Sequence, residues 1–164
     1  MLRLVRSWKS FYDLLKVKVF LDANVFFAAA GSPTGGSAFV LELAKHKKIY
    51  VVTVAHALVE AERNIQKKLD REAVDRHYQN LLDIGVEIQN IDNVPSGITT
   101  ALEKLLIRKD IPILLGAILS KSEFFITLDR KDFIDNKRLQ EAELSFQIVT
   151  PGDFLQKWIR DYEK

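Results

Sequence analysis

Two apolar runs in this sequence each stop at an aspartate. Residues 17–21 (VKVFL) end at Asp22, and residues 124–128 (FFITL) end at Asp129. Asp110 and Glu60 are two further acids, the first just ahead of another apolar run and the second inside an amphipathic helix pattern. Two carboxylates about 4 Å apart repel by roughly 4 kcal/mol at an effective dielectric near 20. Because a divalent cation removes that cost, converging acids at the ends of buried strands predict a metal site.

Each of these acids also has a structural explanation when it is taken alone. Asp22 and Asp129 stand where turn residues and helix caps are common. Asp110 lies two residues before Pro112 and could cap a helix. A helix glutamate such as Glu60 is usually solvated. The case for chemistry therefore rests on the four acids together.

Alternating strand and helix patterns must position these acids. Strands are expected at 17–21, 49–52, 86–88, 124–127 and 147–149. Helices are expected near 37–45, 53–69, 71–83, 98–107, 112–121 and 151–162, with a short helix within 130–140. This order predicts an α/β fold: a single-domain, three-layer α/β/α arrangement with a central parallel sheet of about five strands. In such sheets, sites form outside the carboxyl ends of strands, where Asp22 and Asp129 stand.

Residue types at the expected helix ends support these boundaries. Ser37 is a candidate cap for the helix near 37–45, and Thr53 or a neighbour would open the next one. Asp70 would cap the helix at 71–83, and Gly85 would end it. Residues 1–16 form a separate basic amphipathic helix pattern, so the division expected is an N-terminal helix at 1–16 and one α/β domain at 17–164.

Composition narrows the chemistry further. The chain has 164 residues, 48% of them hydrophobic, a net charge of +2 and no cysteine. Disulfides, thiolate metal sites and a cysteine nucleophile are therefore excluded, and the three histidines lack the spacing of a zinc site. No apolar run reaches the length of about 18 residues that a membrane helix needs, so no membrane partner is expected. These features are compatible with a cytoplasmic protein.

The four acids and their flanks resemble the motifs of the PIN-domain nucleases, over roughly residues 17–155. The first motif is similar to 20–25 (FLDANV), the second to 53–62, the third to 109–114 (KDIPIL) and the fourth, which is the most specific, to 126–133 (ITLDRKDF). The second motif offers two glutamates, Glu60 and Glu62, that point about 200° apart on a helix. Only one can face the site, and the resemblance favours Glu60.

The resemblance implies a set of roles for these residues. Asp22 would be the central ligand of Mg²⁺ or Mn²⁺, with Asp110 and Asp129 beside it. Glu60 would hold a water on the ion or a second ion, so the catalytic set would be Asp22, Glu60, Asp110 and Asp129. Thr127 and Asn24 would support the ligands: Thr127 would orient Asp129 or touch a phosphate oxygen, and Asn24 would hold the loop after the first strand.

The function that the resemblance implies is that of a divalent-metal-dependent ribonuclease. Members of this kind that resemble VapC proteins act as the toxin of a toxin–antitoxin pair, so the expected partners are RNA, an antitoxin protein and a second copy of the chain. Two other interpretations stay open. One is a PIN-fold module that binds RNA or protein without turnover, and the other is a phosphatase-like hydrolase of small phosphoesters. Asn24 weakens the latter, because an aspartyl-phosphate route would use a second aspartate there.

Overall fold

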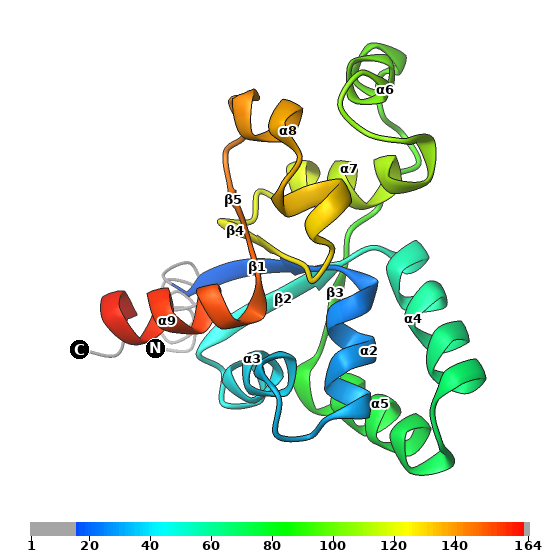
Figure 1. The fold of residues 1–164 in the computed structure, drawn as a ribbon, viewed down its shortest axis with the longest axis vertical. Helices are drawn as coiled ribbons and strands as arrows, with labels where there is room; N and C mark the ends of the chain where they lie inside the picture. Colours follow the sequence, from blue (N-terminus) through cyan, green and yellow to red (C-terminus); the bar gives the residue numbers. More distant parts are fainter. Residues whose placement is uncertain (1–15, 163–164) are drawn as a thin grey trace, which may run out of the picture.

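The computed structural model of the protein describes residues 16–162, and over that range it confirms the α/β architecture (Figure 1). The strands are β1 (Val17–Leu21), β2 (Ile49–Thr53), β3 (Glu87–Ile88), β4 (Phe124–Ile126) and β5 (Gln147–Val149). The α-helices are α2 (Ala23–Gly31), α3 (Gly36–Lys45), α4 (Ala55–Lys68), α5 (Arg71–Ile84), α6 (Ser96–Glu103), α7 (Ile111–Leu119), α8 (Lys137–Glu141) and α9 (Pro151–Tyr162). Two shorter helical turns are η1 (Arg108–Asp110) and η2 (Arg130–Ile134). The helix expected at 1–16 lies, apart from its last residue, outside the described residues.

The five strands form one parallel sheet in the order β3-β2-β1-β4-β5. β1 lies at the centre and pairs Val17 with Ile49 of β2 on one side and Val19 with Phe124 of β4 on the other. Both neighbours run parallel to β1, so the carboxyl ends of β1 and β4 lie side by side. This register brings Asp22 and Thr127 to the same edge of the sheet, although they are 105 positions apart in the chain.

Helices cover both faces of the sheet (Figure 1). On one face, α9 contributes Phe154, whose ring packs edge-on against Phe124 at 5.2 Å between centroids. On the other face, Phe125 of β4 contacts Phe20 of β1 and Phe133 of η2, at 5.4 and 4.8 Å between centroids. This aromatic layer fixes η2 and the residue that opens it, Asp129, against the sheet.

The helix α7 approaches the sheet closely at Gly116. A β-carbon at this position would lie 2.3 Å from Cγ1 of Val54 and 2.9 Å from the ring of Phe20. The missing side chain therefore sets the distance between α7 and the sheet. Because Asp110 stands at the start of α7, the same contact sets how far Asp110 lies from β1.

The boundaries expected from sequence hold at most elements, with one helix cap corrected. Asp70 caps α5 through a bond from the Ala73 N–H, and Gly85 ends α5 with φ +62°, both as predicted. Ser37 was wrong as a cap: Gly35 holds that position, and Ser37 is buried inside α3. The helix expected to open at Thr53 or a neighbour begins after Val54, the neighbour that holds the cap position of α4. Thr53 itself is the last residue of β2, and its hydroxyl donates to the carbonyl of Leu21.

The helix α2 was not predicted, because its sequence lacks an amphipathic stripe. Residues 23–31 (ANVFFAAAG) have no charged residue, and five of the nine are buried. The helix contacts α3, α4 and α5, so its apolar character extends around most of its circumference. Within residues 16–162, no helix is long and apolar enough to cross a lipid bilayer.

Candidate functional site

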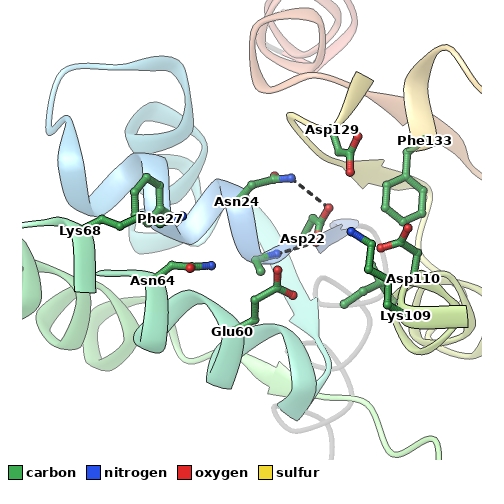
Figure 2. Close-up of a pocket in the computed structure, with 12 residues that line it drawn as sticks. Asp22, Asn24, Phe27, Glu60, Asn64, Lys68, Lys109, Asp110, Asp129 and Phe133 are labelled. Carbon is green, nitrogen blue, oxygen red and sulfur yellow. Dashed lines mark hydrogen bonds between the residues drawn. The ribbon is translucent and has the colours of Figure 1, made fainter. Parts of the chain in front are cut away.

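A cavity of about 220 Å³ opens at the carboxyl edge of the sheet (Figure 2). All four acids of the predicted catalytic set line it, and each comes from a different part of the fold: the end of β1, α4, the start of α7 and the end of β4. The structure thus brings these four distant residues to one place. The cavity is lined by Asp22, Ala23, Asn24, Phe27, Glu60, Asn64, Lys68, Lys109, Asp110, Ile113, Asp129 and Phe133.

Asp22 is buried at the junction of β1 and α2, with only 6% of its surface exposed. Its Oδ1 accepts a bond from the Ala23 N–H at 2.7 Å, so Asp22 caps α2 as well as lining the cavity. Its Oδ2 accepts from the Thr127 hydroxyl at 2.7 Å and from the Asn24 amide at 3.1 Å. The carboxylate orientation is therefore fixed by three donors.

Thr127 and Asn24 tie the ends of β1 and β4 together. Thr127 is fully buried, and its Oγ1 accepts bonds from the Asp129 N–H at 3.0 Å and the Asn24 amide at 3.2 Å. The Oδ1 of Asn24 accepts from the Leu128 N–H at 2.9 Å. Asn24 thus holds the loop after β4. Asn24 itself lies in α2, and not in a loop after the first strand as predicted from the sequence.

Asp129 both caps η2 and lines the cavity. Its Oδ1 accepts the Asp132 N–H at 3.0 Å, so the carboxylate caps η2. Its backbone N–H donates to Thr127, which holds the residue next to Asp22 across the sheet edge. Asp129 thus uses one carboxylate oxygen for the fold while the residue lines the cavity.

Asp110 does not cap a helix, although its position before Pro112 suggested that it could. It stands at the N-terminal end of α7, yet its side chain makes no capping bond. Its Oδ2 is buried and has no hydrogen-bond partner. A buried carboxylate oxygen without a partner is costly and therefore points to a ligand. Lys109, its neighbour in η1, extends into the same space in Figure 2.

The two glutamates of α4 face different ways. Glu60 lines the cavity, and Figure 2 shows its carboxylate below Asp22. Glu62 points toward α5, where one carboxylate oxygen accepts a 2.5 Å bond from the Tyr78 hydroxyl and a 3.2 Å bond from Gln66. The helical geometry that placed the two residues on different faces leaves Glu60 as the one at the cavity.

Burial and mutual repulsion shift the acidity of two of the acids. Burial raises the pKa of Asp22 to about 6, against the lowering effect of the bonds from Thr127 and the Ala23 N–H; the charges of Glu60 and Asp129 raise it further. Burial likewise raises the pKa of Asp110 to about 6. The positive charge of Lys109 opposes that rise, and nearby acids, Asp132 first among them, add to it. Ionisation of these acids is therefore unfavourable in the cavity, and a bound cation would offset the repulsion between them.

The donor chemistry of the cavity fits a hard divalent cation, although the side chains are not arranged as a finished metal site. Among residues 16–162, no three side chains of the acidic, histidine or cysteine type are placed so that they could hold one ion together. The favourable observations are the four carboxylates that line the cavity and the unpartnered Oδ2 of Asp110. The acids fit the ion by type and by shared cavity, and not by a preformed three-ligand geometry.

Thr127 offers a direct test of this hydrogen-bond network. We expect Thr127→Val, which keeps the side-chain shape, to reduce the free energy of unfolding by about 1–3 kcal/mol, because the Asp129 N–H loses its acceptor. The pKa of Asp22 should rise further, since the hydroxyl bond that lowers it is gone. Urea denaturation checks the first effect. Thr127→Ser, which retains the hydroxyl, is the matched control, and an equal loss in both variants would contradict the assignment.

Comparison with solved structures finds a chain of similar fold. It belongs to the crystal structure of VapBC2 from Rickettsia felis bound to a DNA fragment from their promoter. The TM-score is 0.59 at 16% sequence identity, and the match covers 82% of this chain and 98% of that chain. No protein-family model matches the sequence, and no curated protein matches it. The likeness at this identity shows a common fold, so the roles of individual residues have to be argued from the geometry.

Five polar or aromatic residues of the cavity were not among the predicted site residues: Phe27, Asn64, Lys68, Lys109 and Phe133. Lys109 stands directly before Asp110, where a basic neighbour carried no distinct signal. Asn64 and Lys68 follow Glu60 at intervals of four residues along α4, a spacing visible in the sequence once Glu60 is placed at the site. Phe27 lies in the helix that was not predicted, so no pattern could have placed it.

Proposed function

We propose that this protein is a divalent-metal-dependent endoribonuclease of PIN type. The observation that carries the proposal is the convergence of Asp22, Glu60, Asp110 and Asp129 in one cavity at the carboxyl edge of a parallel sheet. Ligand sites of open α/β sheets lie at this edge. The unpartnered oxygen of Asp110 and the raised pKa of Asp22 and Asp110 support a role for these acids as ligands of a cation.

In this proposal the chain's own residues position the reactants. Asp22, Asp110 and Asp129 would hold Mg²⁺ or Mn²⁺, and Glu60 would position the attacking water. When bound, such an ion makes a water acidic enough to attack at neutral pH and offsets the negative charge of the phosphodiester. Thr127 and Asn24 keep the Asp22 carboxylate in one orientation through the bonds described above. The buried donors also exclude bulk water from one side of Asp22.

The biological setting proposed is a toxin–antitoxin pair. It is supported by the sequence resemblance to PIN-domain nucleases of the VapC type and by the likeness of the fold to a chain of VapBC2. RNA is then the substrate, and an antitoxin protein and a second copy of the chain are the protein partners. Co-expression of the gene immediately upstream tests the setting: an antitoxin should relieve growth arrest and co-purify with this protein.

The activity itself is tested with purified protein and single-stranded RNA. We expect cleavage only when Mg²⁺ or Mn²⁺ is added. Cleavage that continues in excess chelator would exclude the metal-dependent mechanism. A chain that binds RNA but neither cuts it nor gives heat with Mn²⁺ in titration calorimetry would instead be a binding module. The absence of a finished three-ligand arrangement in residues 16–162 is the observation that favours this second function.

Metal binding should also stabilise the fold in a pH-dependent way. At pH 7.5, above the pKa of about 6 of Asp22 and Asp110, both acids are ionised and Mn²⁺ at a hundredfold excess over its Kd should add about 2.7 kcal/mol. At pH 5 the two acids are mostly protonated, and most of that gain should vanish. Thermal unfolding followed by circular dichroism checks this, with a Tm increase of about 5–10 °C expected at the higher pH. An equal increase at both pH values would place the ion elsewhere.

A further inference from the structure

Beyond the acids, the cavity continues along one face of α4. Glu60, Asn64 and Lys68 follow each other at intervals of four residues, so their side chains lie in a row along the helix. All three line the cavity, and Figure 2 shows the row running from Glu60 to Lys68 beside Phe27 of α2. At 1.5 Å per residue the row spans about 12 Å. The cavity therefore continues as a track that begins at the acids and ends at a cation.

Beyond Glu60, the residues of this track are Asn64, Lys68 and Phe27, and none of them is an acid. Lys68 is exposed, and its ammonium lies 5.9 Å from the ring centroid of Phe27. It forms no ion pair with any acid of residues 16–162. Phe27 is partly exposed and lines the cavity. Asn64 between them supplies an amide that can both donate and accept.

We infer that this track binds the single strand of nucleic acid on one side of the bond that is cut. Lys68 contacts a backbone phosphate, Phe27 packs against an unstacked base, and Asn64 bonds the sugar or base between them. An aromatic ring beside a cation is the combination that recognises single strands, because every base has a face that can stack. A base held within a duplex does not offer that face. The inference rests on the proposed nuclease function for its substrate.

The opposite end of the cavity fits this path. Lys109 lines the cavity on the side away from Lys68, and Figure 2 shows its ammonium between Asp22 and Asp110. A polyanionic strand that crosses four acids would otherwise be repelled along its length. Lys109 among the acids and Lys68 at the far end of the row offset that repulsion, so the backbone can pass the acids. At the Lys68 end, the strand would follow the row Glu60, Asn64 and Lys68 beside the ring of Phe27.

Binding of RNA to a chain that does not cut it is the direct test. A fluorescent single-stranded RNA oligonucleotide is titrated against Asp22→Asn protein carrying Lys68→Gln, and affinity is measured by anisotropy at several salt concentrations. We expect an affinity loss of about tenfold and a fall of about 0.7 in the slope of log K against log salt, the value for one phosphate contact on a single strand. Lys67→Gln is the matched control, since Lys67 is an exposed neighbour on α4 that does not line the cavity. It should change neither quantity.

Phe27→Leu tests the aromatic part. It keeps an apolar side chain in the packing of α2 but removes the flat ring. We expect an affinity loss of about tenfold that does not change with salt, because base stacking carries no charge. Thermal unfolding of each variant shows whether the fold is retained. Lys68→Arg, which keeps the charge, should recover most of the affinity that Lys68→Gln loses.

The outcomes separate the track from the proposed nuclease function. Equal affinity of the Lys67→Gln and Lys68→Gln proteins would overturn the track, even if the wild-type chain cuts RNA with Mn²⁺. Dependence on Lys68 in a chain that never cuts would support the track and overturn the nuclease. Duplex RNA that competes as well as the single strand would overturn the preference for single strands.

Discussion

Asp22→Asn is expected to slow metal-dependent RNA cleavage by at least about a hundredfold while leaving the chain folded. The substitution keeps the shape of the side chain and removes the charge at the centre of the cavity. We expect a loss of rate of about 10²–10³-fold or more, the range observed when one electrostatic group that acts in the transition state is removed. The measurement is cleavage of a single-stranded RNA under single-turnover conditions with saturating Mn²⁺. Asp75→Asn, which alters an acid of α5 that does not line the cavity, is the control and should keep full activity.

The same variant should become relatively more stable than the wild type as pH rises. Burial raises the pKa of Asp22 from 3.8 to about 6, so the folded state holds a proton that the unfolded chain has already released. Wild-type stability therefore falls between about pH 4 and pH 6 and then stays level. At 1.36 kcal/mol per pKa unit, the loss from this group is about 3 kcal/mol.

The asparagine side chain of the variant does not ionise and escapes that loss. Its altered hydrogen bonds with Thr127 and Asn24 impose a separate cost of about 1 kcal/mol that does not depend on pH. The difference in the free energy of unfolding between variant and wild type should thus grow by up to about 3 kcal/mol from pH 4 to pH 7. Urea denaturation in excess chelator measures it. A difference that stays constant over this range would show that Asp22 ionises normally in the folded chain.

Gly116→Ala should destabilise this protein, although alanine is the better helix former and the change adds only one methyl group. The new β-carbon would lie 2.3 Å from Cγ1 of Val54 and 2.9 Å from the Phe20 ring, so α7 must move away from the sheet. Overpacking of this kind costs about 1–3 kcal/mol, which outweighs the gain of about 1 kcal/mol from replacing a helical glycine. Metal affinity should fall as well, because α7 carries Asp110 at its start.

Gly97→Ala provides the matched control for that prediction. Gly97 also lies in a helix, α6, but nothing lies within 4 Å of the position where its β-carbon would be. There the helix propensity acts alone, and stability should rise by up to about 1 kcal/mol. Thermal and urea unfolding of both variants measure the contrast. Two variants that shift stability in the same direction would show that α7 tolerates the added volume.

Much of the fold could be predicted from the sequence, because local patterns encode it. Apolar runs bounded by polar residues indicated β1 and β5 with the bounds that the structure gives. Capping chemistry placed Asp70 and Gly85 at the two ends of α5. The helix α2 lacked such a pattern, since burial on most of its surface leaves no polar face to mark its period.

The identity of the acids, and the edge of the sheet where they meet, could be predicted without coordinates. Asp22 and Asp129 follow strands, and the carboxyl ends of parallel strands lie together in an α/β fold. The sequence did not reveal that Asp22 would be buried or that Asp129 would act as a cap. Nor did it reveal that Asp110 would keep an oxygen without a hydrogen-bond partner. Asp129 caps a helical turn while Asp110, at a helix start, caps nothing.

The environment of the site depends instead on contacts between distant segments. The bond from Thr127 to Asp22 joins residues 105 positions apart, and Asn24 reaches Leu128 across 104. The track forms because α4 and α2 pack side by side. Periodicity and capping report on neighbours within a few residues of each other. The burial that raises the pKa of Asp22 and Asp110 exists only once the sheet and its helices have assembled.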